Sequence, residues 1–289
     1  MAKYAFVVAA TRGYEEPVRV FISSVLKHHG KEVDIHLLYL DMNGFPVPEN
    51  VYTFEIPRHG NQLLMNYIWR LKYAGVLRQY DAVCMVDADM FCVRDLTKYF
   101  DIAAKANLII GASDCVNIWY EESYRNHYPN ILTEDFYNTK TITSVPLFFS
   151  PRQHGAVFEN VYNWGITHGV VSDLTVMNMF LCRDKHSDLM VLPAHAWTGI
   201  HHTFFKPELR VRRILGRYVS EAGDEIQMIH GRWFDPRWIE GLRTTMAQYF
   251  ADILHLSETG LQKYMALVDD SIQVCLDAYE SYREGPWLL

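Results

Sequence analysis

The sequence predicts an α/β protein, in which a mainly parallel sheet is flanked by helices. Short apolar runs with the length of buried strands alternate with longer segments whose apolar residues recur at helical spacing. The first three elements expected are a strand at 4–10, a helix at 18–29 and a second strand at 33–40. Strand, helix and strand in such close succession indicate a right-handed parallel unit.

The remaining elements continue this alternation. Further strands are expected at 51–56, 81–93, 107–112, 143–149, 190–192 and 226–229, and further helices at 61–77, from residue 95, at 153–168, at 172–180 and along 239–282. Residues 218–225 are expected to form a loop, and His28-His29 and His201-His202 to lie at the surface or in loops. Residues 118–140 show no clean periodicity and leave room for a lid. We expect an α/β domain over 1–240 and a helical extension packed on it over 241–289.

Composition describes an ordinary globular protein. The 289 residues are enough for a large core, and the apolar and charged fractions, 49% and 21%, are typical of soluble proteins. No apolar run approaches the ~20 residues that span a bilayer, and the run at 4–10 fits a first strand better than a signal peptide. The five cysteines lack C-x-x-C spacing, which indicates core thiols in a reducing compartment. We therefore expect a cytoplasmic location.

The charge balance argues weakly against a nucleic-acid partner. The formal net charge is -7, although a local basic groove could be hidden in an acidic total. The one basic cluster, Arg210-Val-Arg-Arg213 with Arg217, could follow a phosphate backbone. Such a cluster is more often a solvated face.

Two carboxylates follow one of the most apolar strands. The run from Ala82 to Val86 leads into Asp87-Ala88-Asp89. Spaced two apart, both acids leave the strand on the same side, and placing them there is costly without a partner. A hard divalent cation such as Mg²⁺ or Mn²⁺ prefers such oxygen ligands. The alternative is a strand end with two solvated acids.

Glycine-rich phosphate loops are absent from the sequence. Neither G-x-x-x-x-G-K-[ST] nor G-x-G-x-x-G occurs. A bound nucleotide would therefore need its phosphates neutralised in another way, and a cation held by Asp87 and Asp89 would do so.

Six short blocks stand out in chain order. They are Ala9-Ala-Thr11-Arg-Gly-Tyr14, Tyr67-Ile-Trp-Arg70, Asp81-Ala-Val-Cys-Met-Val-Asp87-Ala-Asp89, Ser172-Asp173-Leu-Thr-Val-Met-Asn178, Leu192-Pro-Ala-His-Ala-Trp197 and His230-Gly-Arg-Trp-Phe-Asp-Pro236-Arg237-Trp238. In these blocks and their order, the chain resembles, over roughly residues 4 to 240, the retaining nucleotide-sugar glycosyltransferases of the glycogenin and lipopolysaccharide-galactosyltransferase kind, which share the fold called GT-A.

The resemblance implies a metal centre and a donor site. Asp87, Asp89 and His230 would hold Mn²⁺ or Mg²⁺ on the donor diphosphate. Asp173 would contact the donor sugar and Arg70 the ribose or the donor sugar, and these two are the candidate catalytic residues. The candidate nucleotide-binding residues are Ala9, Thr11, Tyr14, Arg70, Asp87, Ala88 and Arg237. The structural alternatives are a helix cap for Asp173, a surface arginine for Arg70 and a hydrogen-bonded structural histidine for His230.

The sequence departs from the family pattern in two places. Thr143-Ser-Val-Pro-Leu147 stands where the family has Phe-Asn-x-Gly, which puts one donor-sugar contact in doubt. Trp233 stands where a glycine is usual, and Pro236-Arg237 where Lys-Pro is usual. An arginine can replace lysine as a phosphate clamp.

The implied activity is transfer of a sugar, with retention of anomeric configuration, from a nucleoside-diphosphate sugar. A UDP-sugar is the first expectation, and the acceptor is left open among a saccharide, a lipid-linked saccharide, a protein and modified nucleic acid. The alternatives are a haloacid-dehalogenase-like phosphatase, which also uses Asp-x-Asp, a transferase acting on modified nucleic acid, and a binder without turnover. The oligomeric state is left open, a homodimer included.

Overall fold

The computed structural model describes residues 3–42, 44–56, 62–117, 140–169, 172–183, 186–193, 197–198, 210–252 and 255–285. By its internal contacts the chain divides into two compact units. The first comprises Met1–Glu15, His29–Ala88 and Leu96–Pro193, and the second comprises Glu16–His28, Asp89–Asp95 and Ala194–Leu289. The predicted division at residue 240 remains a prediction, and that position falls inside a helix, α8 (Pro236–Asp252).

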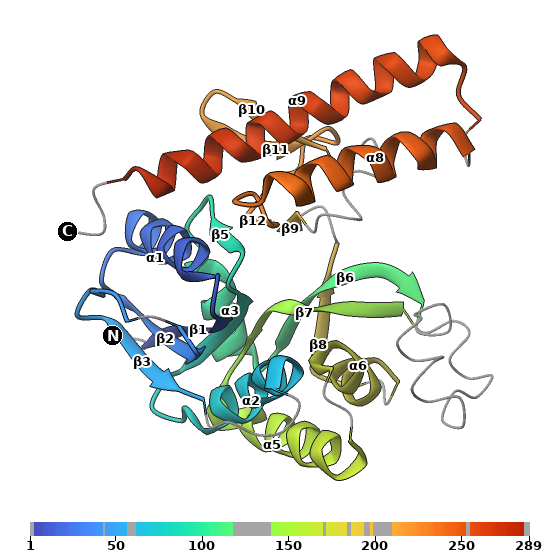
Figure 1. Ribbon diagram of the computed structural model, residues 1–289. Helices are drawn as coiled ribbons and strands as arrows, with labels where there is room; N and C mark the ends of the chain where they lie inside the picture. The colour runs from blue at the N-terminus through green and yellow to red at the C-terminus, as the bar shows by residue number, and fades with distance from the viewer. Residues whose placement is uncertain are drawn as a thin grey trace. The chain divides into compact units, whose positions relative to one another are not determined.

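A seven-stranded mixed sheet forms the centre of the first unit (Figure 1). Its order is β3-β2-β1-β4-β7-β6-β8. The strands are β1 (Tyr4–Thr11), β2 (Val33–Leu40), β3 (Val51–Glu55), β4 (Ala82–Asp87), β6 (Ile109–Asn117), β7 (Lys140–Phe149) and β8 (Leu189–Leu192). Only the pairings of β7, with β4 and with β6, are antiparallel among these strands. The predicted α/β class with a mainly parallel sheet is confirmed.

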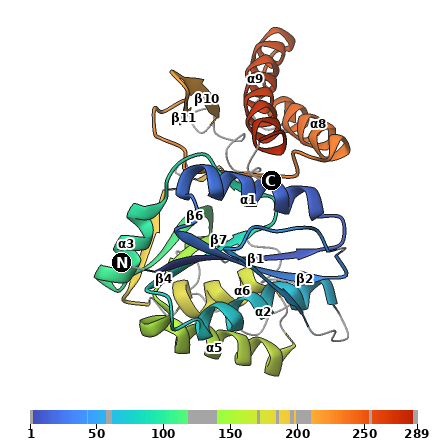
Figure 2. The same ribbon diagram turned by 90° about the vertical axis from the view of Figure 1, so that its left-hand side faces the viewer.

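Helices cover both faces of this sheet, which is why its inner strands are apolar throughout. On one face lie α2 (Gln62–Val76), α5 (Pro151–His168) and α6 (Asp173–Asn178), followed by the π-helical turn Met179–Arg183 (Figure 2). The other face carries α3 (Thr97–Ala106). Successive residues of β7 show the two sides: Phe148 packs on Phe100 of α3, and Phe149 stacks on Phe158 of α5.

The second unit has its own sheet and core. Its elements are most of α1 (Glu15–His29), the three-stranded sheet β5 (Met90–Cys92), β12 (Met228–His230) and β9 (Trp197–Thr198), the hairpin β10 (Val211–Ile214) and β11 (Arg217–Ser220), and the helices α8 and α9 (Glu258–Arg283). Phe91 of β5 packs on Tyr279 and Tyr282 of α9. These rings belong to a buried cluster that α1, α8 and α9 share.

Three sequence-based predictions were wrong. The single strand expected at 81–93 is two strands in different sheets, β4 and β5. The loop expected at 218–225 includes strand β11, because Leu215 and Gly216 form a tight turn with φ of 49° and 79°. His28 and His29 belong to α1 and are not surface residues in a loop: His28 contacts the Tyr282 hydroxyl, and His29 accepts from the Leu96 amide. Residues 118–139 and His201-His202 lie outside the described residues.

Other predictions agree with the structure. The helical tail consists of two helices, α8 and α9, and the helix expected from residue 95 runs over Thr97–Ala106. The cysteines at 84, 92, 182 and 275 are buried free thiols. None of the helices in the described part of the chain combines the length and the apolar character needed to cross a membrane.

A glycine pair sets the distance between α2 and α5. A Cβ on Gly155 would lie 2.3 Å from the carbonyl oxygen of Gly75, and a Cβ on Gly75 would lie 2.9 Å from that of Gly155. Real Cβ atoms do not approach backbone so closely. The two helices can therefore be this close only while both positions lack side chains.

We predict that Gly155→Ala lowers the free energy of unfolding by about 1–3 kcal/mol, as overpacking does, although alanine favours helices. Gly241→Ala in α8 is the matched control, since a Cβ there meets nothing within 4 Å. It should raise the free energy of unfolding by about 0.5–1 kcal/mol. Urea unfolding measures both. Stabilisation by Gly155→Ala would contradict this packing.

Candidate metal centre

Asp87 is the last residue of β4 and is held by a buried arginine. Arg70 of α2, whose side chain is fully buried, donates through Nη1 to Asp87 Oδ1 at 2.7 Å and to the Val86 carbonyl. Through Nη2 it donates to Asp173 Oδ2 at 2.6 Å. Asp173 begins α6 after the cap Ser172, whose hydroxyl accepts from the Thr175 amide. One guanidinium therefore connects the end of β4 to the start of α6.

The charges in this group stabilise one another. Burial by itself would lower the pKa of Arg70, but the carboxylates of Asp87 and Asp173 outweigh it and raise that pKa. The arginine stays charged, as a guanidinium does in proteins. Asp173 is fixed from both sides, because its Oδ1 accepts from the Leu174 amide while its Oδ2 faces Arg70.

Asp89 lies in the turn between β4 and β5 and faces His230, the last residue of β12. Strands β5 and β12 pair antiparallel, with His230 opposite Met90. The Gly231 amide then donates to the Asp89 carbonyl at 2.9 Å. Gly231 has a φ of 150°, a backbone conformation that glycine adopts readily and other residues do not. This backbone contact brings His230 Nε2 to 3.2 Å from Asp89 Oδ1.

The pair has the electrostatics of a salt bridge. Burial alone would raise the pKa of the Asp89 carboxyl, but the imidazolium form of His230 opposes this and holds that pKa below its usual range. Both side chains remain partly exposed, 13% for Asp89 and 24% for His230. A ligand can therefore reach them.

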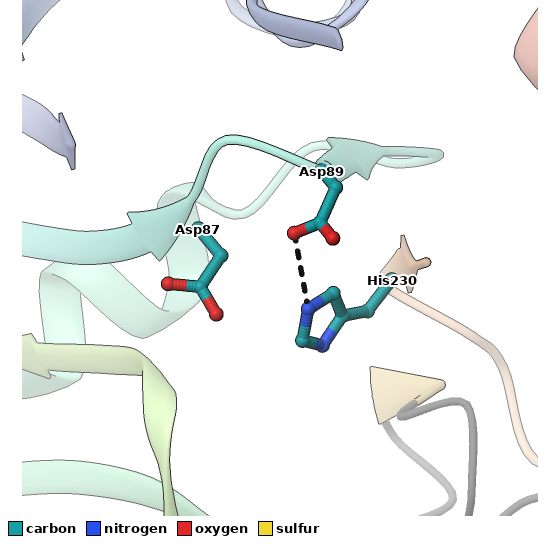
Figure 3. A group of neighbouring side chains, drawn as sticks. All are labelled: Asp87, Asp89 and His230. Carbon is teal, nitrogen blue, oxygen red and sulfur yellow. Dashed lines mark ion pairs between the residues drawn. The ribbon is translucent and has the colours of Figure 1, made fainter. Parts of the chain in front are cut away.

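Asp87, Asp89 and His230 form a three-residue cluster with one ligand atom each, and these atoms all lie within 4.8 Å of one another (Figure 3). Figure 3 shows the two carboxylates on the strand end and the turn after it, with the imidazole facing them. Ligands of an octahedral ion with bonds of ~2.1 Å are about 3 Å apart in cis and about 4.2 Å apart in trans positions. Small side-chain movements would bring all three onto one ion.

The donor set fits a divalent cation. Two carboxylate oxygens and one imidazole nitrogen suit Mn²⁺ or Mg²⁺, and three protein ligands leave positions for phosphate oxygens or water. Arg70 pairs with Asp87 and Asp173, whereas Asp89 faces His230 and is also influenced by the positive charge of the exposed Arg232. A divalent ion would add positive charge next to Asp87 and Asp89.

The remaining predicted contacts fall into two groups. Ala9 pairs in register with Asp87 across β1 and β4, while Thr11 ends β1 and accepts from the Tyr14 amide. Ala88 is buried between the two acids in the chain. These residues follow the carboxyl ends of parallel strands, where such sheets bind ligands. Arg237 is exposed in the first turn of α8, and no contact joins it to the metal-binding cluster among the described residues.

Sequence reasoning missed two contacts of this site. One joins Arg70 to Asp173, which are far apart in the chain. The other joins the Gly231 amide to the Asp89 carbonyl, and the glycine directly after a candidate histidine ligand was its one sequence signal.

Solved glycosyltransferases share this architecture. The galactosyltransferase LgtC, solved with donor and acceptor sugar analogs, aligns with a TM-score of 0.55 and 14% identity over 92% of this chain and 95% of LgtC. A second LgtC structure, with a substitution in its active site, gives a TM-score of 0.56 at the same identity and coverage. The fold is GT-A.

A third GT-A structure, the bifunctional glycosyltransferase WbbM without ligand, aligns with a TM-score of 0.54 and 15% identity over 88% of this chain. The chain spans about half the length of WbbM, at 51%. No protein-family model and no curated protein matches the sequence. At these identities the comparisons establish the fold.

We predict that Arg70→Met lowers the free energy of unfolding by about 3–5 kcal/mol, because it leaves Asp87 and Asp173 without their buried cation. Arg70→Lys should cost less, since it keeps the charge. Arg78→Met is the control, because Arg78 forms an exposed pair with Glu159 at 3.4 Å and such pairs contribute about 1 kcal/mol at most. Urea unfolding compares the three, and equal losses for Arg70→Met and Arg78→Met would contradict the assignment.

Proposed function

We propose that this chain is a metal-dependent glycosyltransferase that moves a sugar from a nucleoside-diphosphate sugar to an acceptor. The observation that carries the proposal is the cluster of Asp87, Asp89 and His230 at the carboxyl end of β4 in a GT-A fold. The fold supports the proposal, because the similar structures LgtC and WbbM are glycosyltransferases. The cluster supports it because these residues of this chain could hold the metal ion that the reaction would use.

The chemistry requires a leaving group to be neutralised. When the anomeric bond breaks, negative charge develops on the departing nucleoside diphosphate, and groups that stabilise this charge accelerate the reaction most. A divalent cation held by Asp87, Asp89 and His230 would supply that stabilisation when bound. In this proposal Ala9, Thr11, Tyr14 and Ala88 surround the nucleotide, which we take to be uridine, and Arg237 faces the phosphates.

Asp173 is best suited to an electrostatic role. Both of its oxygens already accept hydrogen bonds, from Arg70 and from the Leu174 amide. A carboxylate fixed in this way is a weak nucleophile but a well-oriented negative charge, which suits an oxocarbenium-like state at the sugar. Arg70 then acts mainly by holding Asp173 and Asp87 in place. Retention of configuration belongs to the proposal through the resemblance to retaining enzymes.

The structure gives less support to the two alternative functions, a phosphatase and a transferase acting on nucleic acid. A haloacid-dehalogenase-like phosphatase would not be expected to share the GT-A fold. For a transferase acting on nucleic acid, two arginines of the basic cluster are already paired, Arg212 with Glu221 at 3.2 Å and Arg217 with Glu225 at 3.3 Å. The acceptor stays open among saccharides, lipid-linked saccharides, proteins and modified nucleic acid.

We predict that UDP raises the melting temperature only when Mn²⁺ is present, and that the chain with Mn²⁺ slowly hydrolyses UDP-sugars in the absence of acceptor. Asp89→Asn should abolish the Mn²⁺-dependent shift and reduce hydrolysis by a factor on the order of 10² or more, since the ion contributes several kcal/mol. Thermal shift and released UDP are the two measurements.

The control is Asp277→Asn, an exposed carboxylate of α9 that contacts Gln273. It should behave as the parent protein in both assays. Stabilisation by UDP that is the same with Mn²⁺ and with EDTA would overturn the metal centre. Metal-dependent UDP binding without any turnover of sugar nucleotides would indicate a binding protein and refute the enzymatic proposal.

A further inference from the structure

Arg210 is a buried cation whose donors lack acceptors. It directly precedes β10 and is 7% exposed. Its Nε and Nη1 atoms have no hydrogen-bond partner within the described parts of the chain. Glu221 lies 3.9 Å from its Nη2, which is beyond hydrogen-bonding distance. Because a guanidinium stays charged in proteins, donors buried in this way need oxygen acceptors.

The neighbours of Arg210 that the structure describes contact its guanidinium but do not accept hydrogen bonds from its Nε and Nη1 atoms. Its Cζ lies 5.2 Å from the ring centroid of Tyr264 in α9, a cation–π contact. Glu221 is closer to Arg212, at 3.2 Å, than to Arg210. Arg213 has no ion pair among the described residues, and its guanidinium lies 5.8 Å from the ring centroid of Tyr218.

Arg210 lines a pocket of about 540 Å³ in the second unit, a volume within the range of small-molecule sites. The pocket lies where the hairpin β10–β11 meets α9, and Figure 1 shows these elements side by side. Arg212 and Arg213 also line it, as do the apolar side chains of Leu267 and Val274.

The charges lining the pocket favour an anion. Three arginines face two carboxylates, Glu221 and Asp270. Asp270 is exposed, so water and salt screen it, and they screen the exposed Arg212 and Arg213 in the same way. Arg210 is buried, with Glu221 3.9 Å from its Nη2, and contributes the least screened positive charge in the pocket.

We propose that this pocket is a phosphate-binding site, in which Arg210 Nε and Nη1 donate to the oxygens of a phosphomonoester and Arg213 neutralises its second charge. Phosphate suits the site better than a carboxylate does. A carboxylate has two oxygens and one charge, which Arg210 alone would satisfy, whereas a phosphomonoester has three free oxygens and approaches two charges. The rest of the volume, with its apolar wall, would hold the organic part of the ligand.

The test is titration of the full chain with inorganic phosphate by calorimetry, at low salt and with EDTA, so that the metal centre does not contribute. The parent protein should bind phosphate, and Arg210→Met should raise the Kd about tenfold or more, as expected for the loss of charge-assisted hydrogen bonds. Arg217→Gln is the matched control, since Arg217 is an exposed arginine of the same hairpin that does not line the pocket. It should leave the Kd unchanged.

A second variant is expected to change the phosphate affinity in the opposite direction. Glu221→Gln removes the carboxylate that competes for Arg210 and Arg212, so phosphate should bind more tightly. Because Glu221 also pairs with Arg212 at 3.2 Å, this gain tests whether the arginines of the pocket together bind phosphate. If Arg210→Met does not fold, Arg210→Lys, which keeps the charge but has fewer donors, should still raise the Kd. Absence of phosphate binding to the parent, equal binding by Arg210→Met, or unchanged or weaker binding by Glu221→Gln would each overturn the proposal.

Two further probes identify the source of the phosphate. Binding of glucose 6-phosphate that Arg210→Lys weakens would indicate a soluble phosphorylated saccharide. Sedimentation with vesicles containing phosphatidic acid, but not with phosphatidylcholine alone, and with the same dependence on Arg210, would indicate a lipid headgroup. Either result supports a phosphate site, and binding of both probes that is insensitive to Arg210 contradicts it.

Discussion

The ion pair that Arg70 forms with Asp87 and Asp173 is the contact on which the rest of the candidate site depends. β4 is apolar and buried from Ala82 to Val86, so a carboxylate at its end requires a partner that the protein itself supplies. Arg70 is that partner, and its side chain is completely buried as a result. Because the same guanidinium also contacts Asp173, the position of α6 is coupled to the end of β4 by two short hydrogen bonds.

Arg70 pairs with two of the three carboxylates, Asp87 and Asp173, and Asp89 faces His230 instead. His230 can neutralise Asp89 only while it is protonated. A divalent cation would remove this dependence, because it would bind the neutral imidazole together with both carboxylates. In the proposed function, the fold brings the three candidate ligands together and the cation supplies the remaining positive charge.

The sequence predicted the acids, the histidine and the sheet, because each has a local signature. Apolar runs of strand length predicted β1, β2 and β4, and the order of short blocks predicted that His230 belongs with Asp87 and Asp89.

The contacts that the sequence did not predict depend mainly on residues distant in the chain. The periodicity of α2 does not show that Arg70 points inward to Asp173. Similarly, the basic cluster at 210–213 looks like a solvated face, and the sequence does not show that Arg210 is buried with its guanidinium over the ring of Tyr264 in α9. The turn at Leu215 was not predicted because a leucine seldom adopts a positive φ.

The central claim is that His230 and the two acids bind one ion together, and the nitrogen ligand makes this directly measurable. Electron spin-echo spectroscopy of bound Mn²⁺ in the presence of UDP detects a coordinated histidine nitrogen, and labelling the histidines with ¹⁵N changes its signal. The account predicts one such nitrogen in the parent protein and none in His230→Asn. Mn²⁺ that binds with oxygen ligands alone, and with identical spectra in the parent and His230→Asn, would contradict it.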